Sequence, residues 1–294
     1  MRTYRIARVK SFLAFCLAIA GSLLAQPIVS DSHFVELDGA KVHYTNYGKG
    51  DTALFLVHGW SCDETVWSGQ APILADRMRV ITIDLPGHGQ SEEPHIDYTM
   101  DLYARAIDAV LRDANVSSVV LVGHSNGTPV IRHFYRKFPA KVRALVIVDG
   151  PLRPFFNKES MEKFIAPMRG DNYPEAAGRL VDGMTKPVKD EALRTQIKTL
   201  MLKTPQYVAV SEFEATGDPA LWKEDKIDVP VLMILAKQPA WTSEYEQFVR
   251  RLVPEVDYQV WENVSHFLMM DKPREFNAAL LAFLEKKQLL PNRS

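Results

Sequence analysis

Five short runs of apolar residues, spaced along the chain, constrain the fold of this sequence more than any other feature. They are "TALFLVHG", "RVITIDLPG", "SSVVLVGHS", "RALVIVDG" and "VPVLMILA", and turn-forming residues bound each of them. Strands that are apolar throughout, rather than alternately, are covered on both faces, as in parallel sheets. Helical patterns separate the runs, such as "TMDLYARAIDAVLRDAN" with Thr99 as its cap. We therefore predict an α/β fold with a mostly parallel central sheet and helices on both faces.

Three further segments complete this pattern. "FVELDGAKVHYTNYG" alternates on both sides of Asp38-Gly39, which predicts an antiparallel hairpin before the parallel strands. Near the C-terminus, "VDYQVW" is strand-like and "REFNAALLAFLEKK" is an amphipathic helix.

The interval from Pro151 to Asp228 breaks the alternation, because it contains helical pieces and prolines but no strand-like run. We predict that residues 151–228 form a helical cap inserted into an α/β core made of residues 26–150 and 229–294. Insertions of this kind normally lie at the carboxyl ends of the strands, where the loops of an active site gather.

The first 25 residues are a separate segment. A basic stretch with no acidic residue, "MRTYRIARVK", precedes the apolar "SFLAFCLAIAGSLLA", and small residues offer cleavage near Ala20 or Ala25. This layout is typical of a secretory signal peptide. We predict an exported protein, periplasmic or secreted, with no stable membrane insertion after removal of residues 1–25. The alternative is an uncleaved membrane anchor, which the short apolar stretch disfavours.

Removal of that segment takes four positive charges and no negative charge from a chain of formal net charge −1, which leaves −5. Nucleic-acid binding depends on clustered Lys and Arg, so we expect no nucleic-acid partner. Cys62 becomes the one remaining cysteine, so no disulfide forms within the chain. The sequence leaves the oligomeric state open.

The strongest chemical signal is "VVLVGHSNGTPVI". An apolar strand ends at Gly123, Ser125 follows two residues later, and a helical pattern begins directly after Gly127. This is the G-x-S-x-G nucleophile elbow in its required context, in which small residues allow a tight strand-to-helix turn. The helix N-terminus favours negative charge beside the serine hydroxyl. We predict Ser125 as a nucleophile.

The loop in "LFLVHGWSCDETVW" follows an earlier strand of the same sheet. In an elbow hydrolase this loop supplies one oxyanion donor, and the residue after the nucleophile supplies the other. The candidates are the backbone N–H groups of Trp60 and Asn126. We interpret the Trp60 indole as a wall of the core and Cys62 as a small buried group. The turn "DLPGHGQS", with Asp84 and His88, is interpreted as structural.

"WENVSHFLMMDKPREF" places His266 after the last strand-like run and before the last helix, which makes it the candidate general base. No pair of histidines has Cys, Asp or Glu at a metal-ligand spacing. We therefore predict no metal, and no other cofactor is indicated.

Together these motifs resemble the α/β-hydrolase superfamily over roughly residues 34–290. The similarity is to its capped single-domain esterases, haloperoxidase-like perhydrolases, dehalogenases and C–C bond hydrolases. The resemblance implies Ser125 as nucleophile, His266 as base, and backbone donors at Trp60 and Asn126. Dehalogenases and epoxide hydrolases use aspartate at the elbow, so a serine there disfavours those two reactions.

The third catalytic group is not in the position that the resemblance makes commonest. The loop after "VLMILA" carries Lys237, Gln238, Pro239, Ala240 and Trp241 and no acid. A glutamine can bond to an imidazole but cannot stabilise an imidazolium with charge. Some family members place the acid after the preceding strand instead, and in "RALVIVDG" that residue is Asp149. We predict Asp149 as the acid; the alternative is that it only caps the first turn of the cap or bonds backbone N–H groups.

The resulting hypothesis is a serine hydrolase that cleaves a carboxylic ester or lactone through an acyl-enzyme. Perhydrolase or C–C hydrolase chemistry on the same triad remains an alternative, as does a ligand-binding protein without catalysis. The substrate is expected to be small and apolar, because the predicted cap is rich in aromatic residues and methionines. These are Phe155, Phe156, Met161, Phe164, Met168, Met184 and Met201.

Overall fold

The computed structural model describes residues 30–291. The predicted signal peptide, residues 1–25, lies outside this range. Between residues 30 and 291, no helix combines the length and the apolar character that crossing a membrane requires.

The described residues form one eight-stranded sheet with the strand order β1-β2-β4-β3-β5-β6-β7-β8. The strands are β1 (Ser30–Leu37), β2 (Ala40–Tyr47), β3 (Thr52–Val57), β4 (Arg79–Ile83), β5 (Ser118–His124), β6 (Val142–Val148), β7 (Val231–Ala236) and β8 (Asp257–Trp261). β1 and β2 pair antiparallel, as do β2 and β4. All other pairs are parallel. The prediction of an α/β fold with a mostly parallel sheet is confirmed.

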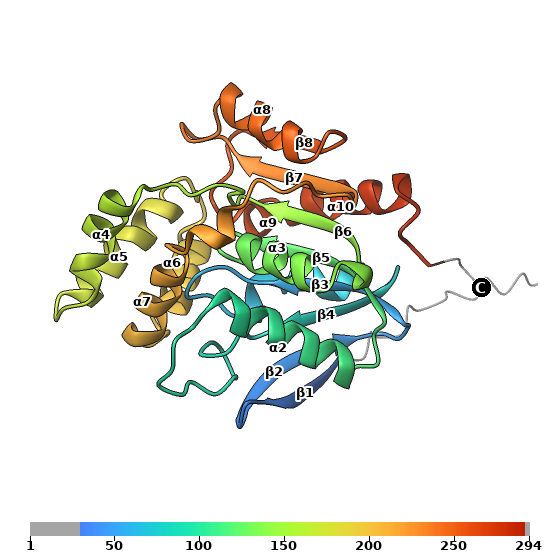
Figure 1. The fold of residues 1–294 in the computed structure, drawn as a ribbon, viewed down its shortest axis with the longest axis horizontal. Coiled ribbons are helices and arrows are strands. Elements are labelled where there is room, and N and C mark those ends of the chain that lie inside the picture. The colour runs from blue at the N-terminus through green and yellow to red at the C-terminus, as the bar shows by residue number, and fades with distance from the viewer. Residues whose placement is uncertain (1–29, 292–294) are drawn as a thin grey trace, which may run out of the picture.

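Helices cover both faces of this sheet (Figure 1). One face carries α2 (Met100–Asp113), α3 (Gly127–Lys137) and α8 (Ser243–Leu252), and the other carries α1 (Ala71–Leu74), α9 (Leu268–Asp271) and α10 (Pro273–Lys286). Two short 3₁₀ helices, η1 (Glu64–Trp67) and η2 (Pro139–Lys141), lie in the connections. Side chains of each strand alternate between two core clusters: in β3, Phe55 and Val57 join one, Leu54 and Leu56 the other. This two-sided burial explains why the strand sequences are apolar throughout.

Local signals in the sequence account for two of these elements. In the β1–β2 hairpin, Asp38 and Gly39 have φ values of 53° and 84°, the left-handed conformation that the favoured two-residue turn requires. At the start of α2, the Thr99 hydroxyl oxygen accepts a hydrogen bond from the N–H of Leu102 at 3.1 Å.

Between β6 and β7 the chain forms only helices and loops. They are α4 (Lys158–Ile165), η3 (Ala166–Met168), α5 (Tyr173–Thr185), α6 (Glu191–Met201), α7 (Gln206–Ala215) and η4 (Pro219–Trp222). α4 to α7 lie together beside the ends towards which the arrows of β5, β6 and β7 point (Figure 1). We call residues 151–228 the cap, keeping the boundaries predicted from sequence. Since the cap leaves the core directly after β6, it lies over the loops that carry the candidate site.

Candidate active site

Ser125 lies in a tight turn between β5 and α3. Its φ of 51° is in the left-handed region, which a non-glycine residue adopts only where its surroundings hold it. Its N–H donates to the carbonyl of Val148 at 2.9 Å. A Cβ at Gly123 would lie 2.5 Å from the carbonyl oxygen of Gly127, and a Cβ at Gly127 would lie 2.7 Å from that of His58. The two glycines therefore permit the close approach of strand and helix that the elbow requires.

His266 and Asp149 come together from loops 117 residues apart in sequence. The Nδ1 atom of His266 lies 2.7 Å from Oδ2 of Asp149. The Asp149 side chain is 1% exposed, and that of His266 is 18% exposed. Among residues 30–291, no hydrogen bond engages Nε2 of His266. An imidazole bonded to a carboxylate through Nδ1 and open at Nε2 is the arrangement of a general base.

Two further donors hold the Asp149 carboxylate. Its Oδ1 accepts the backbone N–H of Ala236 at 2.9 Å and the indole N–H of Trp241 at 3.0 Å. Gln238 lines the cavity described below but makes no hydrogen bond with His266. The loop after β7 thus supports the predicted acid, which directly follows β6, through Trp241, a role that was not predicted from the sequence. The sequence feature that could have indicated this role is Trp241 itself, because it lies in the loop where a triad acid is commonest.

Two buried histidines, His58 and His124, belong to the motifs but had no role in the sequence-based predictions, and of the two His124 contacts a predicted site residue. Nε2 of His124 donates to the carbonyl of His266 at 2.9 Å and so fixes the backbone of that residue. Burial, followed by the neighbouring His266, lowers the pKa of His124 well below its usual value. Nε2 of His58 accepts the N–H of Leu85 at 3.0 Å, and burial lowers its pKa to about 4. Both rings are therefore neutral near pH 7.

The two predicted oxyanion donors belong to loops that meet at Ser125. Trp60 lies in a turn closed by a hydrogen bond from the N–H of Cys62 to the carbonyl of Gly59 at 3.1 Å, and Asn126 follows Ser125 directly. Among the described residues, no protein acceptor engages the backbone N–H of Trp60 or of Asn126. Both residues line the same cavity as Ser125. Unpaired N–H groups at this place are available to a substrate oxygen.

Cys62 is a free, buried cysteine, as its interpretation as a small buried group expects. Burial raises the pKa of its thiol well above the usual value. A thiol held in this protonated form is a poor nucleophile.

A cavity of about 740 Å³ connects these groups. Ser125, Asn126, Asp149 and His266 line it from the core. Five of the seven apolar cap residues noted in the sequence also line it: Phe155, Phe156, Met161, Phe164 and Met184. The other two, Met168 and Met201, are buried instead in the hydrophobic cluster that the cap helices share with the core. The wall opposite the nucleophile is therefore predominantly apolar.

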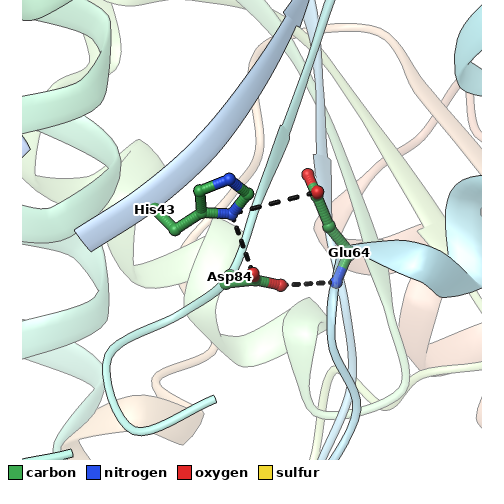
Figure 2. A group of neighbouring side chains, drawn as sticks. All are labelled: His43, Glu64 and Asp84. Carbon is green, nitrogen blue, oxygen red and sulfur yellow. Dashed lines mark hydrogen bonds and ion pairs between the residues drawn. The ribbon is translucent and has the colours of Figure 1, made fainter. Parts of the chain in front are cut away.

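One cluster of ligand-type side chains lies outside this cavity (Figure 2). The ligand atoms of His43, Glu64 and Asp84 lie within 4.8 Å of one another. Oδ2 of Asp84 lies 2.8 Å from Nδ1 of His43, and Oδ1 accepts the N–H of Glu64 at 2.8 Å. The Glu64 carboxylate accepts the hydroxyl groups of Thr45 and Thr82. Because the atoms that would bind a cation are already hydrogen-bonded, we interpret the cluster as a structural network joining β2, η1 and the turn after β4.

A family model for the α/β-hydrolase fold matches residues 52–273, well over half of the chain. The chain belongs to the α/β-hydrolase family. The resemblance predicted from the elbow and its neighbouring motifs is thereby confirmed. The catalytic roles of five residues stay predictions, and the structure adds the geometry described above. These residues are Ser125, His266, Asp149, Trp60 and Asn126.

Individual relatives differ in activity. The chain is 29% identical over 249 residues to the dihydrolipoyllysine-residue acetyltransferase component of the acetoin cleaving system of Pseudomonas putida. That match covers 81% of this chain and 65% of the relative, so the chain spans less than two thirds of the relative's length.

Two solved structures are similar over most of the hydrolase. Est816, described as an N-acyl homoserine lactone degrading enzyme, has 27% identity and a TM-score of 0.72, covering 85% of this chain and 100% of its own. A bromoperoxidase from Bacillus anthracis has a TM-score of 0.75 at 20% identity, covering 87% of this chain and 100% of its own. At that identity the second likeness shows the fold alone.

Proposed function

We propose that this hydrolase cleaves a carboxylic ester or lactone, with Ser125 as nucleophile, His266 as base and Asp149 as acid. The observation that carries the proposal is the bond of 2.7 Å between Nδ1 of His266 and Asp149 at the wall of the cavity that Ser125 also lines. A base with its second nitrogen open to the nucleophile's cavity is what activation of a serine hydroxyl requires.

In this mechanism Ser125 Oγ attacks the carbonyl carbon while His266 Nε2 takes the hydroxyl proton. The backbone N–H groups of Trp60 and Asn126 bind the oxygen as it becomes negative. His266 then gives its proton to the departing alkoxide oxygen, and an acyl group remains on Ser125. Water attacks this acyl-enzyme with His266 again as base, which releases the carboxylic acid and restores the serine.

The apolar cavity favours a substrate with an apolar acyl chain. Five aromatic or methionine side chains of the cap line it, and burial of each CH₂ group of a ligand is worth about 0.8 kcal/mol. The likeness to Est816 adds acyl lactones to the classes worth testing, since that protein is described as degrading N-acyl homoserine lactones.

The experiment combines a reactivity test with a substrate screen. A fluorophosphonate probe should label the wild-type protein and leave Ser125→Ala unlabelled. Nitrophenyl esters and N-acyl homoserine lactones of graded chain length should be hydrolysed by the wild type, and Ser125→Ala should retain less than about one part in a thousand of that activity. Thermal unfolding checks that the variant is folded.

The same experiment addresses the alternatives. A labelled protein that hydrolyses neither esters nor lactones, but forms a peracid from a carboxylic acid and hydrogen peroxide or splits a C–C bond, would replace the ester hydrolase by one of those enzymes. A folded protein that neither reacts with the probe nor turns over any of these substrates would support the non-catalytic ligand-binding alternative.

A further inference from the structure

A buried carboxylate of the cap touches both loops of the predicted oxyanion hole. Glu212 projects from α7, and its side chain is 1% exposed. Its Oε1 accepts a hydrogen bond from the side-chain amide of Asn126 at 2.8 Å, and its Oε2 accepts the backbone N–H of Ser61 at 3.4 Å. Asn126 and Trp60 carry the predicted donors, and Ser61 follows Trp60 directly. One carboxylate therefore bridges the two segments whose relative position defines the hole.

The contact to Ser61 acts on an unfavourable backbone conformation. Ser61 is the third residue of the turn closed between Gly59 and Cys62, and its φ is 53°, in the region that normally favours glycine. Such a conformation persists only where its surroundings hold it. The hydrogen bond from the Ser61 N–H to Glu212 is one such restraint. The Trp60 indole provides another, because it donates to the carbonyl of Ala209 on α7 at 2.8 Å.

A negative charge at this place opposes an oxyanion unless it is balanced, and His88 supplies the balance. Nε2 of His88 lies 3.3 Å from Oε2 of Glu212, and its Nδ1 lies 3.1 Å from the carbonyl oxygen of Pro86. The contact at Nε2 is an ion-pair distance rather than a formed hydrogen bond, and the nearby carboxylate favours the charged form of the ring. Burial lowers the pKa of His88, but Glu212 outweighs it and the net shift is upward. Burial likewise raises the pKa of Glu212, but His88 outweighs it and the net shift is downward.

We propose that Glu212, charge-balanced by His88, is a positioning residue that sets the relative placement of the Trp60 and Asn126 oxyanion donors and so makes turnover depend on a docked cap. Glu212 is absent from the lining of the cavity and touches no reacting atom, so it acts through Asn126 and Ser61. The proposal rests on the proposed serine hydrolase function, since it assigns a role within that mechanism.

The test compares two substitutions of Glu212 with a matched control on the same helix. Glu212→Gln keeps an oxygen acceptor for the Asn126 amide but places its NH₂ group beside the Ser61 N–H and His88, whereas Glu212→Met removes both acceptor oxygens. In the control, Ser211→Ala removes a different contact between cap and core, the hydrogen bond from the N–H of Tyr98 to the Ser211 hydroxyl at 2.8 Å. Hydrolysis of p-nitrophenyl butyrate is measured at saturating and at low substrate, per site labelled to completion by a fluorophosphonate.

We expect Glu212→Met to lower kcat by about 10- to 100-fold with KM within about threefold of wild type, because displaced donors weaken only the transition state. Glu212→Gln, which keeps the acceptor for Asn126 but not the one for Ser61, should regain part of that loss, and Ser211→Ala should keep kcat while unfolding at a lower temperature. Because kcat is counted per labelled site, a smaller folded fraction in Glu212→Met does not mimic the effect.

Two results overturn the positioning role while leaving the proposed function intact. One is a Glu212→Met variant with wild-type kcat; the other is a Ser211→Ala variant that loses as much kcat as Glu212→Met, which would assign the effect to cap docking in general. A wild-type protein that neither hydrolyses the ester nor reacts with the probe overturns the proposed function itself, and the positioning role with it.

Discussion

Two aspartate–histidine pairs in this hydrolase have nearly the same geometry but lie in different surroundings. Oδ2 of Asp149 lies 2.7 Å from Nδ1 of His266, and Oδ2 of Asp84 lies 2.8 Å from Nδ1 of His43 (Figure 2). Both carboxylates are buried, with side chains 1% and 2% exposed. If only the contact between carboxylate and imidazole is considered, either histidine could be an oriented base.

The other ring nitrogen separates them. Nε2 of His43 lies 2.8 Å from the hydroxyl of Ser32 and 3.3 Å from the side-chain amide of Gln90, and the ring is fully buried. Nε2 of His266 has no hydrogen-bonding partner among residues 30–291, and its ring borders the cavity. A carboxylate fixes the ring and its charge, but only an open second nitrogen beside a nucleophile allows proton transfer. The Asp149–His266 pair therefore suits catalysis, and the Asp84–His43 pair suits stability.

The largest effect expected from this comparison is the loss of activity on substitution of Asp149. Asp149→Asn keeps the shape of the acid but removes the charge that stabilises the imidazolium, and an amide can favour the wrong tautomer of His266. The analogous change in a serine protease lowers kcat by about 10⁴-fold. We expect a loss of that order in ester hydrolysis, with an unfolding temperature that shows a folded protein. Near-full activity of the variant would remove Asp149 from the triad.

The equivalent change in the other pair should affect stability instead. Asp84→Asn breaks a buried pair and leaves a backbone donor without its acceptor, so the free energy of unfolding should fall by about 3 kcal/mol. The kcat of the folded protein should stay within about threefold of wild type. Urea denaturation and kcat per labelled site measure the two quantities. A drop in kcat comparable to that of Asp149→Asn would erase the distinction between the pairs.

The stability difference between wild type and Asp84→Asn should also depend on pH. Burial raises the pKa of Asp84, but the bonds from His43, Gln90 and Glu64 outweigh it and leave the pKa below the ordinary value of 3.8. A group with a depressed pKa in the folded state contributes stability above its unfolded value and loses it as the pH falls through the folded value. Denaturation at pH 7 and at progressively lower pH should therefore show the difference shrinking below pH 3.8.

A smaller effect is expected from the indole that supports Asp149. Trp241→Phe removes the N–H that Oδ1 accepts at 3.0 Å while keeping an aromatic ring, and the Ala236 N–H remains as a donor. Hydrogen bonds to charged groups contribute about 1.5–3 kcal/mol, part of which orients the carboxylate. We expect kcat to fall by about tenfold with KM little changed. An unchanged kcat in steady-state assays would mean that Ala236 alone suffices.

The smallest effect should come from Gln238. This residue occupies the loop where a triad acid is commonest, yet it makes no hydrogen bond with His266. Gln238→Ala should change kcat/KM for a short-chain nitrophenyl ester by less than about fivefold. A loss approaching that of Asp149→Asn would show that the glutamine, rather than the aspartate, orients the base.

Much of this arrangement could be predicted from sequence, because its signals are local. The apolar runs indicated the strands, and "GHSNG" after one of them indicated the elbow at Ser125. Asp149 was reached indirectly: the loop around Gln238 holds no acid, and the neighbouring strand ends in one. Parallel strands bring their carboxyl ends to one edge of the sheet. An acid at the end of the neighbouring strand can therefore be inferred from sequence to take the place of the missing one. The export signal, outside the described residues, stays a prediction.

The contacts between cap and core could not be predicted in this way. Glu212 lies 86 residues after Asn126 in a helix whose sequence, "QYVAVSEFEA", has no strongly polar face. No local pattern tells which loop such a helix covers. The helix holds two acidic residues, Glu212 and Glu214, and the sequence does not tell that only Glu212 is buried and so requires a partner. For Trp241 and His124, the partners are likewise set by tertiary packing rather than by spacing.

The bridging carboxylate on α7 has a consequence for protein engineering. A chimera in which a foreign cap replaces residues 151–228 without an acid at the position of Glu212 leaves the buried His88 without its carboxylate partner and the half-buried Asn126 amide without its acceptor. A buried polar group without a partner costs about 1–3 kcal/mol. The graft must therefore carry the acid with it, or the recipient must lose His88 at the same time. Libraries that vary the cavity-facing side chains of α4 and α5 avoid this mismatch, and they offer the more direct way to new substrates.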